Sequence, residues 1–422
     1  MPTIPDPAAI LGAVTMDIEA VQAALREDGL DGWLLYDFHG SNPIARTLAG
    51  LGGGGKLTTR RWYYLVPAAG EPLALVHRIE QDVLAHLPGR RRLYAGRAQL
   101  EAGLAELAGG GGRLAMEYSP DGAIPYISRV DAGTVEAVRR LGAAVVSSGD
   151  LVQRFEAVWS ADALATHRAA SASLYRIKDR AFALVAERMA TGAPVNELEV
   201  QQAMVGWFEQ EGLVSDSAPV VAAQEHSGNP HYLPTPASSR AIGRDEIVLL
   251  DLWGKRDAAG AVYADITWVG YTGAHVPAEE AAVFRAAREA RDAAVARVRD
   301  AVRAGRELRG WEVDRAAREV IDGAGFGARF VHRTGHSLGQ EVHGNGVHMD
   351  DYETHDDRRL LPGTGFTIEP GIYLERFGVR TEINMHVGPR EATVTGPLQA
   401  ALLTLGTGGE SGVAASRSYG VT

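Results

Sequence analysis

The segment Glu246–Thr272, EIVLLDLWGKRDAAGAVYADITWVGYT, contains two strand-like apolar runs on either side of a turn-like stretch, GKRDAAG. Asp251 closes the first run, and Asp265 lies inside the second. In a hairpin centred near Ala258, the two aspartates are expected opposite each other, with Cβ atoms about 5 Å apart. Carboxylates placed in this way repel each other unless one is protonated or a cation lies between them. The alternative is a surface hairpin whose acids are hydrated.

Two further acids lie in comparable settings. Glu369 belongs to the run TGFTIEPGIY, which Pro370 and Gly371 interrupt, and Glu382 belongs to the run VRTEINMHV. Arg380, two residues before Glu382, would share its face in a strand. The sequence therefore places four acids inside strands or at their ends.

The segment Val331–His348, VHRTGHSLGQEVHGNGVH, holds four of the 13 histidines of the chain. His332 and His336 have the spacing of a zinc-binding helix, but Arg333 stands where such a helix needs glutamate, and two glycines disfavour a helix here. A single histidine is more often a hydrogen-bonded polar residue than a ligand. Together with the four acids, however, the segment predicts a site of mostly oxygen donors with one or two nitrogens. Such a set suits Mn²⁺, Co²⁺ or Fe²⁺, and zinc is a further possibility.

The composition excludes several other chemistries. The chain has no cysteine, which rules out disulfides, thiolate catalysis and cysteine-ligated zinc. Its 42 basic and 53 acidic residues give a formal net charge of −11, which disfavours non-specific binding to nucleic acid or anionic membranes. No apolar run reaches the length of about 18 residues that a membrane-spanning helix needs. The N-terminus lacks the basic start of a signal peptide, so a cytoplasmic protein is expected.

The 422 residues are enough for two domains. Residues 1–155 alternate helical and strand-like segments and predict an α/β domain. Residues 156–405 combine long helices with hairpin-like strands and predict an α+β domain, and residues 406–422 are expected to be a flexible tail. The glycine-rich stretch Gly50–Lys56 has the spacing of a phosphate-binding loop, but Leu57 replaces the required serine or threonine, so a flexible loop is preferred.

The ordered series LLDLWG, YADITW, HRTGHSLGQEVH, TIEPGIY and RTEIN resembles the pita-bread metallopeptidases, which include methionine aminopeptidase, aminopeptidase P, prolidase and the creatinase relatives. The resemblance covers about Ser160 to Leu405, and the five-part series is highly specific. The smaller N-terminal domain resembles that of the proline-specific and creatinase branch. The resemblance therefore implies an α+β pita-bread catalytic domain preceded by a smaller α/β creatinase-like domain.

The resemblance also implies a dinuclear metal site. It assigns five ligands: Asp251, Asp265, His336, Glu369 and Glu382. Of these, Asp265 and Glu382 would bridge both ions. Four more positions match residues around the pocket: His343 for substrate contact and proton transfer, His332 for pocket support, Arg380 for orientation of the site, and His231 on a substrate-side loop. The interval between the two aspartates is longer than usual, Trp268 replaces an arginine after ADIT, and His348 has no counterpart.

The chemistry implied is hydrolysis by a hydroxide that bridges two divalent metals, with Glu369 accepting its proton and His343 bonding to the tetrahedral intermediate. The preferred substrate class is the Xaa-Pro dipeptide, as for a prolidase. An Xaa-Pro bond is a tertiary amide without an N–H, which general peptidases handle poorly. The alternatives are an aminopeptidase P acting on longer peptides, a creatinase-like hydrolase or lyase, and a non-enzymatic binding module on the same fold.

A dipeptidase must also hold the C-terminal carboxylate of its substrate. Arg358 and Arg359 are expected to bind it, with a solvated loop as the alternative. Because a partner subunit's N-terminal domain often walls the cleft in this family, the loop YDFHGSNPIART offers Asp37, His39 and Arg46 as substrate contacts. The expected assembly is a homodimer with two divalent ions, Mn²⁺ before Co²⁺, Zn²⁺ or Fe²⁺.

Overall fold

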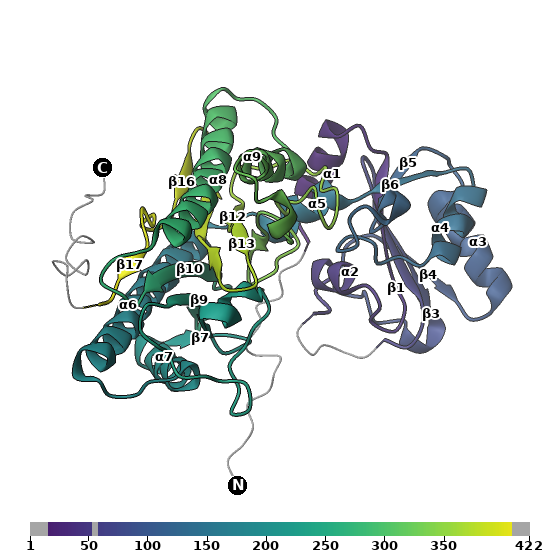
Figure 1. The fold of residues 1–422 in the computed structure, drawn as a ribbon. Helices are drawn as coiled ribbons and strands as arrows, with labels where there is room; N and C mark the ends of the chain where they lie inside the picture. Colours follow the sequence, from purple (N-terminus) through teal and green to yellow (C-terminus); the bar gives the residue numbers. More distant parts are fainter. Residues whose placement is uncertain (1–15, 53–57, 407–422) are drawn as a thin grey trace, which may run out of the picture. The chain divides into compact units, whose positions relative to one another are not determined.

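The structure is a computed structural model that describes residues 16–52 and 58–406. The chain divides into two compact units, Met1–Glu156 (unit 1) and Ala157–Thr422 (unit 2) (Figure 1). Three segments discussed above lie wholly or partly outside the described residues: the N-terminal residues 1–15, residues 53–57 of the glycine-rich loop, and residues 407–422 of the expected tail.

Unit 1 is built on one mixed six-stranded sheet, in the order β4-β3-β2-β1-β5-β6. The pairs β1–β2 and β2–β3 are antiparallel and the other pairs are parallel. The strands are β1 (Gly32–Asp37), β2 (Trp62–Pro67), β3 (Leu73–His77), β4 (Arg90–Tyr94), β5 (Arg113–Met116) and β6 (Ala144–Ser147). All six residues of β1 are buried, as expected for a central strand that is covered on both faces.

Helices cover both faces of this sheet, so the described part of unit 1 has two apolar clusters. Trp33 and Leu35 of β1 belong to one cluster, whereas Leu34 and Tyr36 belong to the other. The helices are α1 (Ile18–Glu27), α2 (Pro43–Leu48), α3 (Arg97–Ala108), α4 (Ala132–Arg140) and α5 (Gly149–Val152), with short helical turns η2 (Arg78–Glu80), η3 (Pro120–Gly122) and η4 (Gln153–Ala157).

Unit 2 begins with its longest helix. Ser160 caps the N-terminus of this helix by accepting a hydrogen bond from Ala163 N at 3.1 Å, and Gly192 ends it in the left-handed conformation, φ 73°. The helices are α6 (Ala161–Thr191), α7 (Glu197–Glu211), α8 (Ala278–Arg303) and α9 (Gly310–Gly323), with turns η5 (Gln224–Gly228) and η6 (Gly327–Arg329). None of the helices in the described residues has the length and apolar composition needed to cross a membrane.

The strands of unit 2 form two main sheets and one short hairpin. The first sheet has the order β17-β10-β9-β7, with β8 also paired to β9; the second has the order β11-β12-β15-β16; β13 pairs with β14. The strands are β7 (Leu213–Val214), β8 (Val220–Ala223), β9 (Ile247–Arg256), β10 (Ala264–Tyr271), β11 (Ser337–Leu338), β12 (Gly365–Ile368), β13 (Gly371–Tyr373), β14 (Gly378–Arg380), β15 (Ile383–Val387), β16 (Ala392–Val394) and β17 (Leu403–Thr404).

The two-residue period of β9 and β10 decides which side chains face the second sheet. Leu250 and Ile266 pack with α6 and α7 in one cluster, whereas Leu249 and Val269 pack with α8, α9 and the second sheet in another (Figure 1). Asp251, Asp265 and Thr267 are an even number of residues from Leu249 or Val269 on the same strand, so they lie on the same face. Their side chains therefore point toward the second sheet.

The predicted hairpin forms, but its predicted register is wrong by two residues. Asp251 pairs with Thr267, and Asp265 pairs with Trp253. The connection folds one residue later than expected, because Ala261 N donates to Ala258 O at 3.2 Å while Tyr263 N donates outward to Gly339 O at 2.9 Å. Since the shift is even, both aspartates stay on one face, as diagonal rather than direct neighbours.

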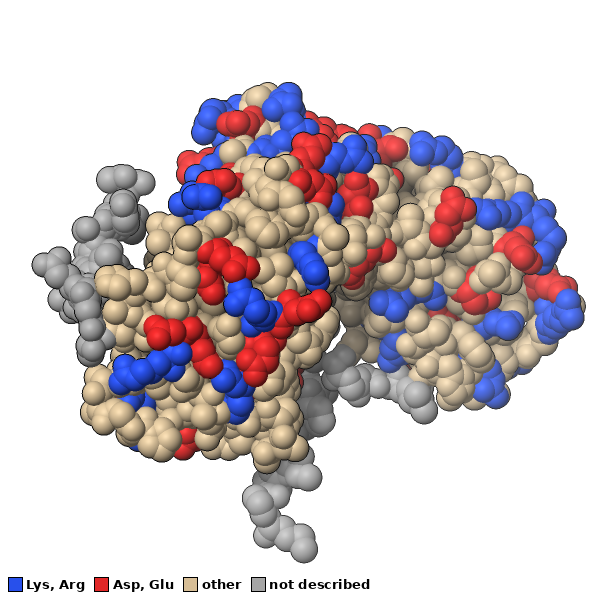
Figure 2. All heavy atoms as spheres, in the orientation of Figure 1, with Lys and Arg blue, Asp and Glu red and all other residues tan. Residues whose placement is uncertain are grey.

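Backbone groups join the two sheets close to these acids. Asp265 N donates to Asn384 Oδ1 at 2.9 Å, and Glu382 N donates to Thr267 O at 3.2 Å. These bonds hold the start of β10 against the start of β15. On the face shown in Figure 2, acidic and basic side chains are interspersed over both units, in agreement with an ordinary acidic surface.

Candidate metal centre

Three potential ligands from the two sheets of unit 2 converge in the interior. One donor atom each of Asp265, His336 and Glu382 lies within 4.8 Å of the other two, and all three residues are buried. Asp265 comes from β10, His336 precedes β11, and Glu382 precedes β15. Two carboxylates and one imidazole in this arrangement form a ligand set that a divalent transition metal accepts.

The hydrogen bonding of the two carboxylates supports a cation at this position. Asp265 Oδ1 and Glu382 Oε1 are buried and accept no hydrogen bond. Burial, and after it the negative charge of neighbouring carboxylates, raises the pKa of both groups well above the ordinary range. Buried polar atoms are nearly always paired, so oxygens with neither donor nor cation are costly. The residues present therefore fit a bound divalent cation.

Glu369 and Asp251 flank this group of three. His336 Nε2 lies 3.5 Å from Glu369 Oε1 and 3.6 Å from Asp265 Oδ2. Burial raises the pKa of Glu369 to about 7, against the opposing effect of Arg380 and Arg333. Burial also raises the pKa of Asp251. Asp251 and Glu369, both half-buried, thus lie beside the three residues that could share one ion.

Arg380 links Asp251 to the aromatic side of the site. Its guanidinium donates to Asp251 Oδ2, to Thr267 Oγ1 at 2.9 Å and to Tyr373 Oη at 3.0 Å. The same tyrosine oxygen lies 2.8 Å from His332 Nε2. Burial, and then the positive charge of Arg380, lowers the pKa of His332 to about 3. A neutral His332 therefore supports the site through Tyr373.

Two threonines, which sequence reasoning missed, orient the carboxylates. Thr267 Oγ1 donates to Glu382 Oε2 at 2.7 Å. Thr367 Oγ1 accepts from His336 N at 2.9 Å and donates to Glu369 Oε1 at 3.1 Å. A signal was present, because each threonine lies two residues from an acid and therefore on the same strand face.

Asp314 of α9 is a second feature that the sequence did not reveal. Its Oδ1 accepts from Thr334 N at 2.8 Å and from Thr334 Oγ1 at 2.6 Å, and it pairs with Arg318 at 3.1 Å. Arg318 also donates to His332 O at 2.9 Å. Together they fix the backbone of the HRTGH segment that carries His336.

His343 and His231 lie at the accessible edge of the site. His343 is exposed, and its ring centroid lies 4.4 Å from that of His336. Desolvation first, and then the charge of Arg333, lowers the pKa of His343, and His231 contributes in the same direction. The structure therefore places His231 within electrostatic reach of His343.

Three other assigned or discussed residues have different surroundings. Arg358, predicted to bind a substrate carboxylate, is buried, and its guanidinium pairs with Asp356 at 2.5 Å. Arg359 is half-buried in an isolated bridge with Arg309. His348, for which no function was predicted, is buried, and its Nδ1 accepts from Ser337 N at 3.1 Å.

The two assigned residues of unit 1 organise their own loop. Asp37 is fully buried and accepts from Asn42 N at 3.0 Å and Gly40 N at 3.2 Å. Arg46 donates to Thr58 Oγ1 at 2.9 Å and to Leu51 O at 3.0 Å. The predicted substrate contacts of Asp37 and Arg46 thus fall on side chains that already have partners within their own unit. His39, which has a φ of 59°, is exposed, as are Ser41 and Thr47 of the same loop.

The replacement of the expected arginine by Trp268 brings in another cation. Lys178 of α6 is buried, and its Nζ lies 3.8 Å from the centre of the Trp268 ring. Lys178 also pairs with Asp179 at 2.5 Å. Burial lowers the pKa of Lys178. On the face of β10 opposite to Thr267, the Trp268 indole therefore packs against the Lys178 side chain.

Comparison with known proteins gives matches in sequence. The sequence pattern of metallopeptidase family M24 matches residues 168–389. The chain is 31% identical over 176 residues to an Xaa-Pro dipeptidase of Lactobacillus helveticus, a match that covers 41% of this chain and 43% of the relative. It is 30% identical over 243 residues to the probable dipeptidase PepE of Mycobacterium tuberculosis, covering 57% and 59%. The chain spans about half the length of the curated relatives that it matches.

The likeness in structure extends over nearly the whole chain. The dipeptidase PepE from Mycobacterium ulcerans has a TM-score of 0.66 at 23% identity, over 94% of this chain and all of that one. A prolidase from Thermococcus sibiricus has a TM-score of 0.58, also at 23% identity, over 92% and 98%. At these identities the likeness is one of fold. The predicted pita-bread unit with a smaller α/β unit before it is thereby confirmed.

Proposed function

The chain belongs to metallopeptidase family M24, and from this premise we propose that it hydrolyses the Xaa-Pro peptide bond, in dipeptides before longer peptides. One observation carries the proposal: Asp265 and Glu382 turn buried, unpaired oxygens toward the same volume as His336. We propose Asp251, Asp265, His336, Glu369 and Glu382 as ligands of two divalent ions, with Mn²⁺ as the first choice. When bound, such ions supply a hydroxide nucleophile at neutral pH, because they lower the pKa of water.

The chain's own residues would position the substrate and move its protons. Thr367 fixes Glu369 Oε1, and Glu369 is the group placed to accept a proton and deliver it to the leaving nitrogen. His343, exposed beside His336, is placed to donate a hydrogen bond to the scissile carbonyl. Arg380 holds Asp251 through the contact described above, with Tyr373 and His332 behind it.

Substrate recognition needs a carboxylate near the free amine and a cation near the C-terminus of the dipeptide. With Arg358 committed to Asp356, Arg333 and Arg359 become the candidates for the second role. Arg333 has the better support, because its charge lowers the pKa of both Glu369 and His343. His231 would contact the substrate from its own loop.

The remaining parts of the proposal concern assembly. We propose a cytoplasmic homodimer in which residues 1–155 form the dimer contacts and wall the partner's active site, while residues 156–405 carry the chemistry. His39 is one exposed residue of the unit 1 loop that is accessible for such a contact. Analytical ultracentrifugation of the full chain tests the dimer, and a monomer at assay concentration would contradict it.

An assay with added Mn²⁺ tests the function directly. We expect turnover of Xaa-Pro dipeptides and little turnover of Xaa-Pro-Xaa tripeptides; preference for tripeptides would favour an aminopeptidase P instead. Glu369→Gln should fold normally yet lose turnover, since the amide cannot accept the proton. Absence of bound transition metal, together with no activity restored by Mn²⁺, Co²⁺ or Zn²⁺, would overturn the enzyme reading.

A further inference from the structure

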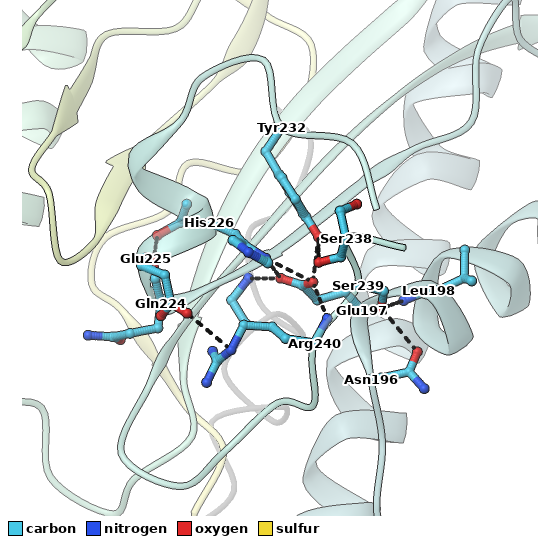
Figure 3. A network of polar contacts seen from close by, with 12 residues as sticks. Asn196, Glu197, Leu198, Gln224, Glu225, His226, Tyr232, Ser238, Ser239 and Arg240 are labelled. Carbon is cyan, nitrogen blue, oxygen red and sulfur yellow. Dashed lines mark hydrogen bonds and ion pairs between the residues drawn. The ribbon is translucent and has the colours of Figure 1, made fainter. Parts of the chain in front are cut away.

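A second buried carboxylate of unit 2 lies away from the proposed ligands and has a different environment. Glu197, the first residue of α7, is fully buried. Its Oε1 accepts from Ala223 N at 2.7 Å, and its Oε2 accepts from Arg240 N at 3.0 Å and from Tyr232 Oη at 2.6 Å. His226 Nδ1 lies 2.9 and 3.0 Å from the two oxygens. Figure 3 shows these groups converging on the one carboxylate.

These partners come from both ends and from the interior of one irregular segment. Ala223 ends β8, and Arg240 lies where the chain returns to α7, with Glu197 N donating to Arg240 O at 3.1 Å. His226 and Tyr232 lie between these ends, and their rings stack with centroids 4.2 Å apart. One carboxylate therefore closes the segment Ala223–Arg240 and also holds two of its side chains.

The segment carries His231, which the proposed function places beside the substrate. His231 is exposed and directly precedes Tyr232, whose hydroxyl is bound to Glu197. Asn229 shapes the same turn, because its Oδ1 accepts from His231 N at 3.0 Å and its carbonyl accepts from Tyr232 N at 3.1 Å. The backbone of His231 is thus fixed from the Tyr232 side by Glu197 and from the other side by Asn229.

The opposite side of the segment packs on the hairpin that carries Arg380. Gly378 N donates to Ser227 Oγ at 2.8 Å. A Cβ at Gly228 would lie 2.3 Å from Leu374 O, so only glycine permits this approach. The segment is therefore held between α7 and the β13–β14 hairpin. Any displacement that Glu197 prevents would otherwise change the position of His231 relative to the site.

We propose that Glu197 is a positioning residue that sets the location of His231, and through it the affinity for the peptide substrate, while leaving the chemical step unaffected. The proposal rests on the proposed function for its substrate. It follows from the donor pattern: every partner of Glu197 is an N–H or O–H group, and only a carboxylate offers acceptors to all of them. Such a fully satisfied buried network gives rigidity and a unique conformation.

Glu197→Gln is the main test, because the amide replaces one acceptor by a donor that faces other donors. With Mn²⁺ and an Xaa-Pro dipeptide, we expect KM to rise about tenfold and kcat to change less than about twofold, the pattern of lost binding rather than lost chemistry. Tyr232→Phe keeps the ring stack and removes one donor, so it should fold and raise KM about threefold. An unchanged KM in both variants, or a loss confined to kcat, would overturn the proposal.

A double-mutant cycle identifies the route of the effect. In a His231→Ala background, Glu197→Gln should raise KM no further, because the residue through which Glu197 acts is already absent. Additive effects would mean that Glu197 acts by another route and would contradict the proposal.

Hydrogen exchange supplies a readout that needs no substrate. Glu197→Gln and Tyr232→Phe should speed amide exchange in the segment Ala223–Arg240 and leave β9 and β10 unchanged. Glu117→Gln is the matched control, since Glu117 of unit 1 is equally buried and accepts from Trp33 Nε1 at 2.8 Å and Asn42 Nδ2 at 2.7 Å. It should destabilise without altering exchange in the segment. A wild-type protein without Xaa-Pro hydrolysis would overturn the proposed function and the substrate part of this inference, whereas unchanged exchange would overturn the positioning role alone.

Discussion

In unit 2, the carboxylate of Glu197 and the carboxylates of Asp265 and Glu382 are all buried, but their surroundings differ. Around Glu197, two backbone N–H groups, an imidazole and a phenol point at one acid. Around Asp265 and Glu382, the neighbours are other acids, and one oxygen of each accepts nothing. A buried acid with matched donors stabilises the fold, whereas buried acids that face one another need a proton or a cation between them. Burial alone would not have distinguished these two roles.

The largest expected effect comes from removing a charge at the site that needs a cation. Asp265→Asn should lower kcat/KM on the order of a thousandfold, because metal catalysis is worth several kcal/mol. Bound metal measured by plasma mass spectrometry should fall in parallel. Glu197→Gln should leave the metal content unchanged. Equal loss of metal in Asp265→Asn and Glu197→Gln would contradict the proposal that only the region around Asp265 holds a cation.

A second test concerns a buried histidine whose hydrogen-bond partners are matched, as those of Glu197 are. His167 of α6 is fully buried between Tyr263 O and Thr395 Oγ1, each at 2.7 Å, and burial lowers its pKa to about 4. Because the folded pKa lies below the unfolded value of about 6.5, protonation favours the unfolded state. The contribution of His167 to the free energy of unfolding is therefore fully present above pH 6.5. It is lost as the pH falls toward 4, and the loss amounts to about 3 kcal/mol.

Urea unfolding of the metal-free protein at several pH values measures this loss. His167→Leu should show a smaller decrease in unfolding free energy between pH 6.5 and 4.5 than the wild type. An identical slope in both proteins would mean that His167 does not carry the acid sensitivity.

The smallest expected effect concerns the sign of a stability change. In the metal-free protein, Glu382→Gln should raise the free energy of unfolding by about 1 kcal/mol, since it removes a repelling charge and keeps an acceptor for Thr267. Glu197→Gln should lower it by about 1–3 kcal/mol, because buried donors lose their partner. Urea titration in the presence of a chelator compares the two. Destabilisation of equal size by both variants would contradict the difference described above.

Sequence patterns placed the four acids in strands or at strand ends, whereas only the family resemblance singled out His336 among the histidines. Sequence reasoning failed where partners lie far along the chain. The hairpin register depended on Tyr263 bonding to Gly339, a contact that no local pattern reveals. The bond from Thr267 to Glu382 joins two sheets that no local pattern brings together.

Side chains with partners inside the chain show a second limit. Arg358 follows Asp356 by two residues and forms a buried ion pair with it. Asp37, predicted as a substrate contact, accepts backbone N–H groups from its own turn. Long polar side chains after a strand can equally fold back on the chain or reach a ligand, and composition does not decide between these outcomes.

The meeting of the two sheets at Asp265 and Glu382 also affects how long the folded molecule persists. A cation held by donors from β10 and from the start of β15 joins elements that must separate before either sheet can open. Such a link slows the rate of unfolding as well as shifting the equilibrium. Loaded with metal, the protein should therefore survive a protease for much longer than the chelated form, so that its half-life in the cell follows the supply of the ion.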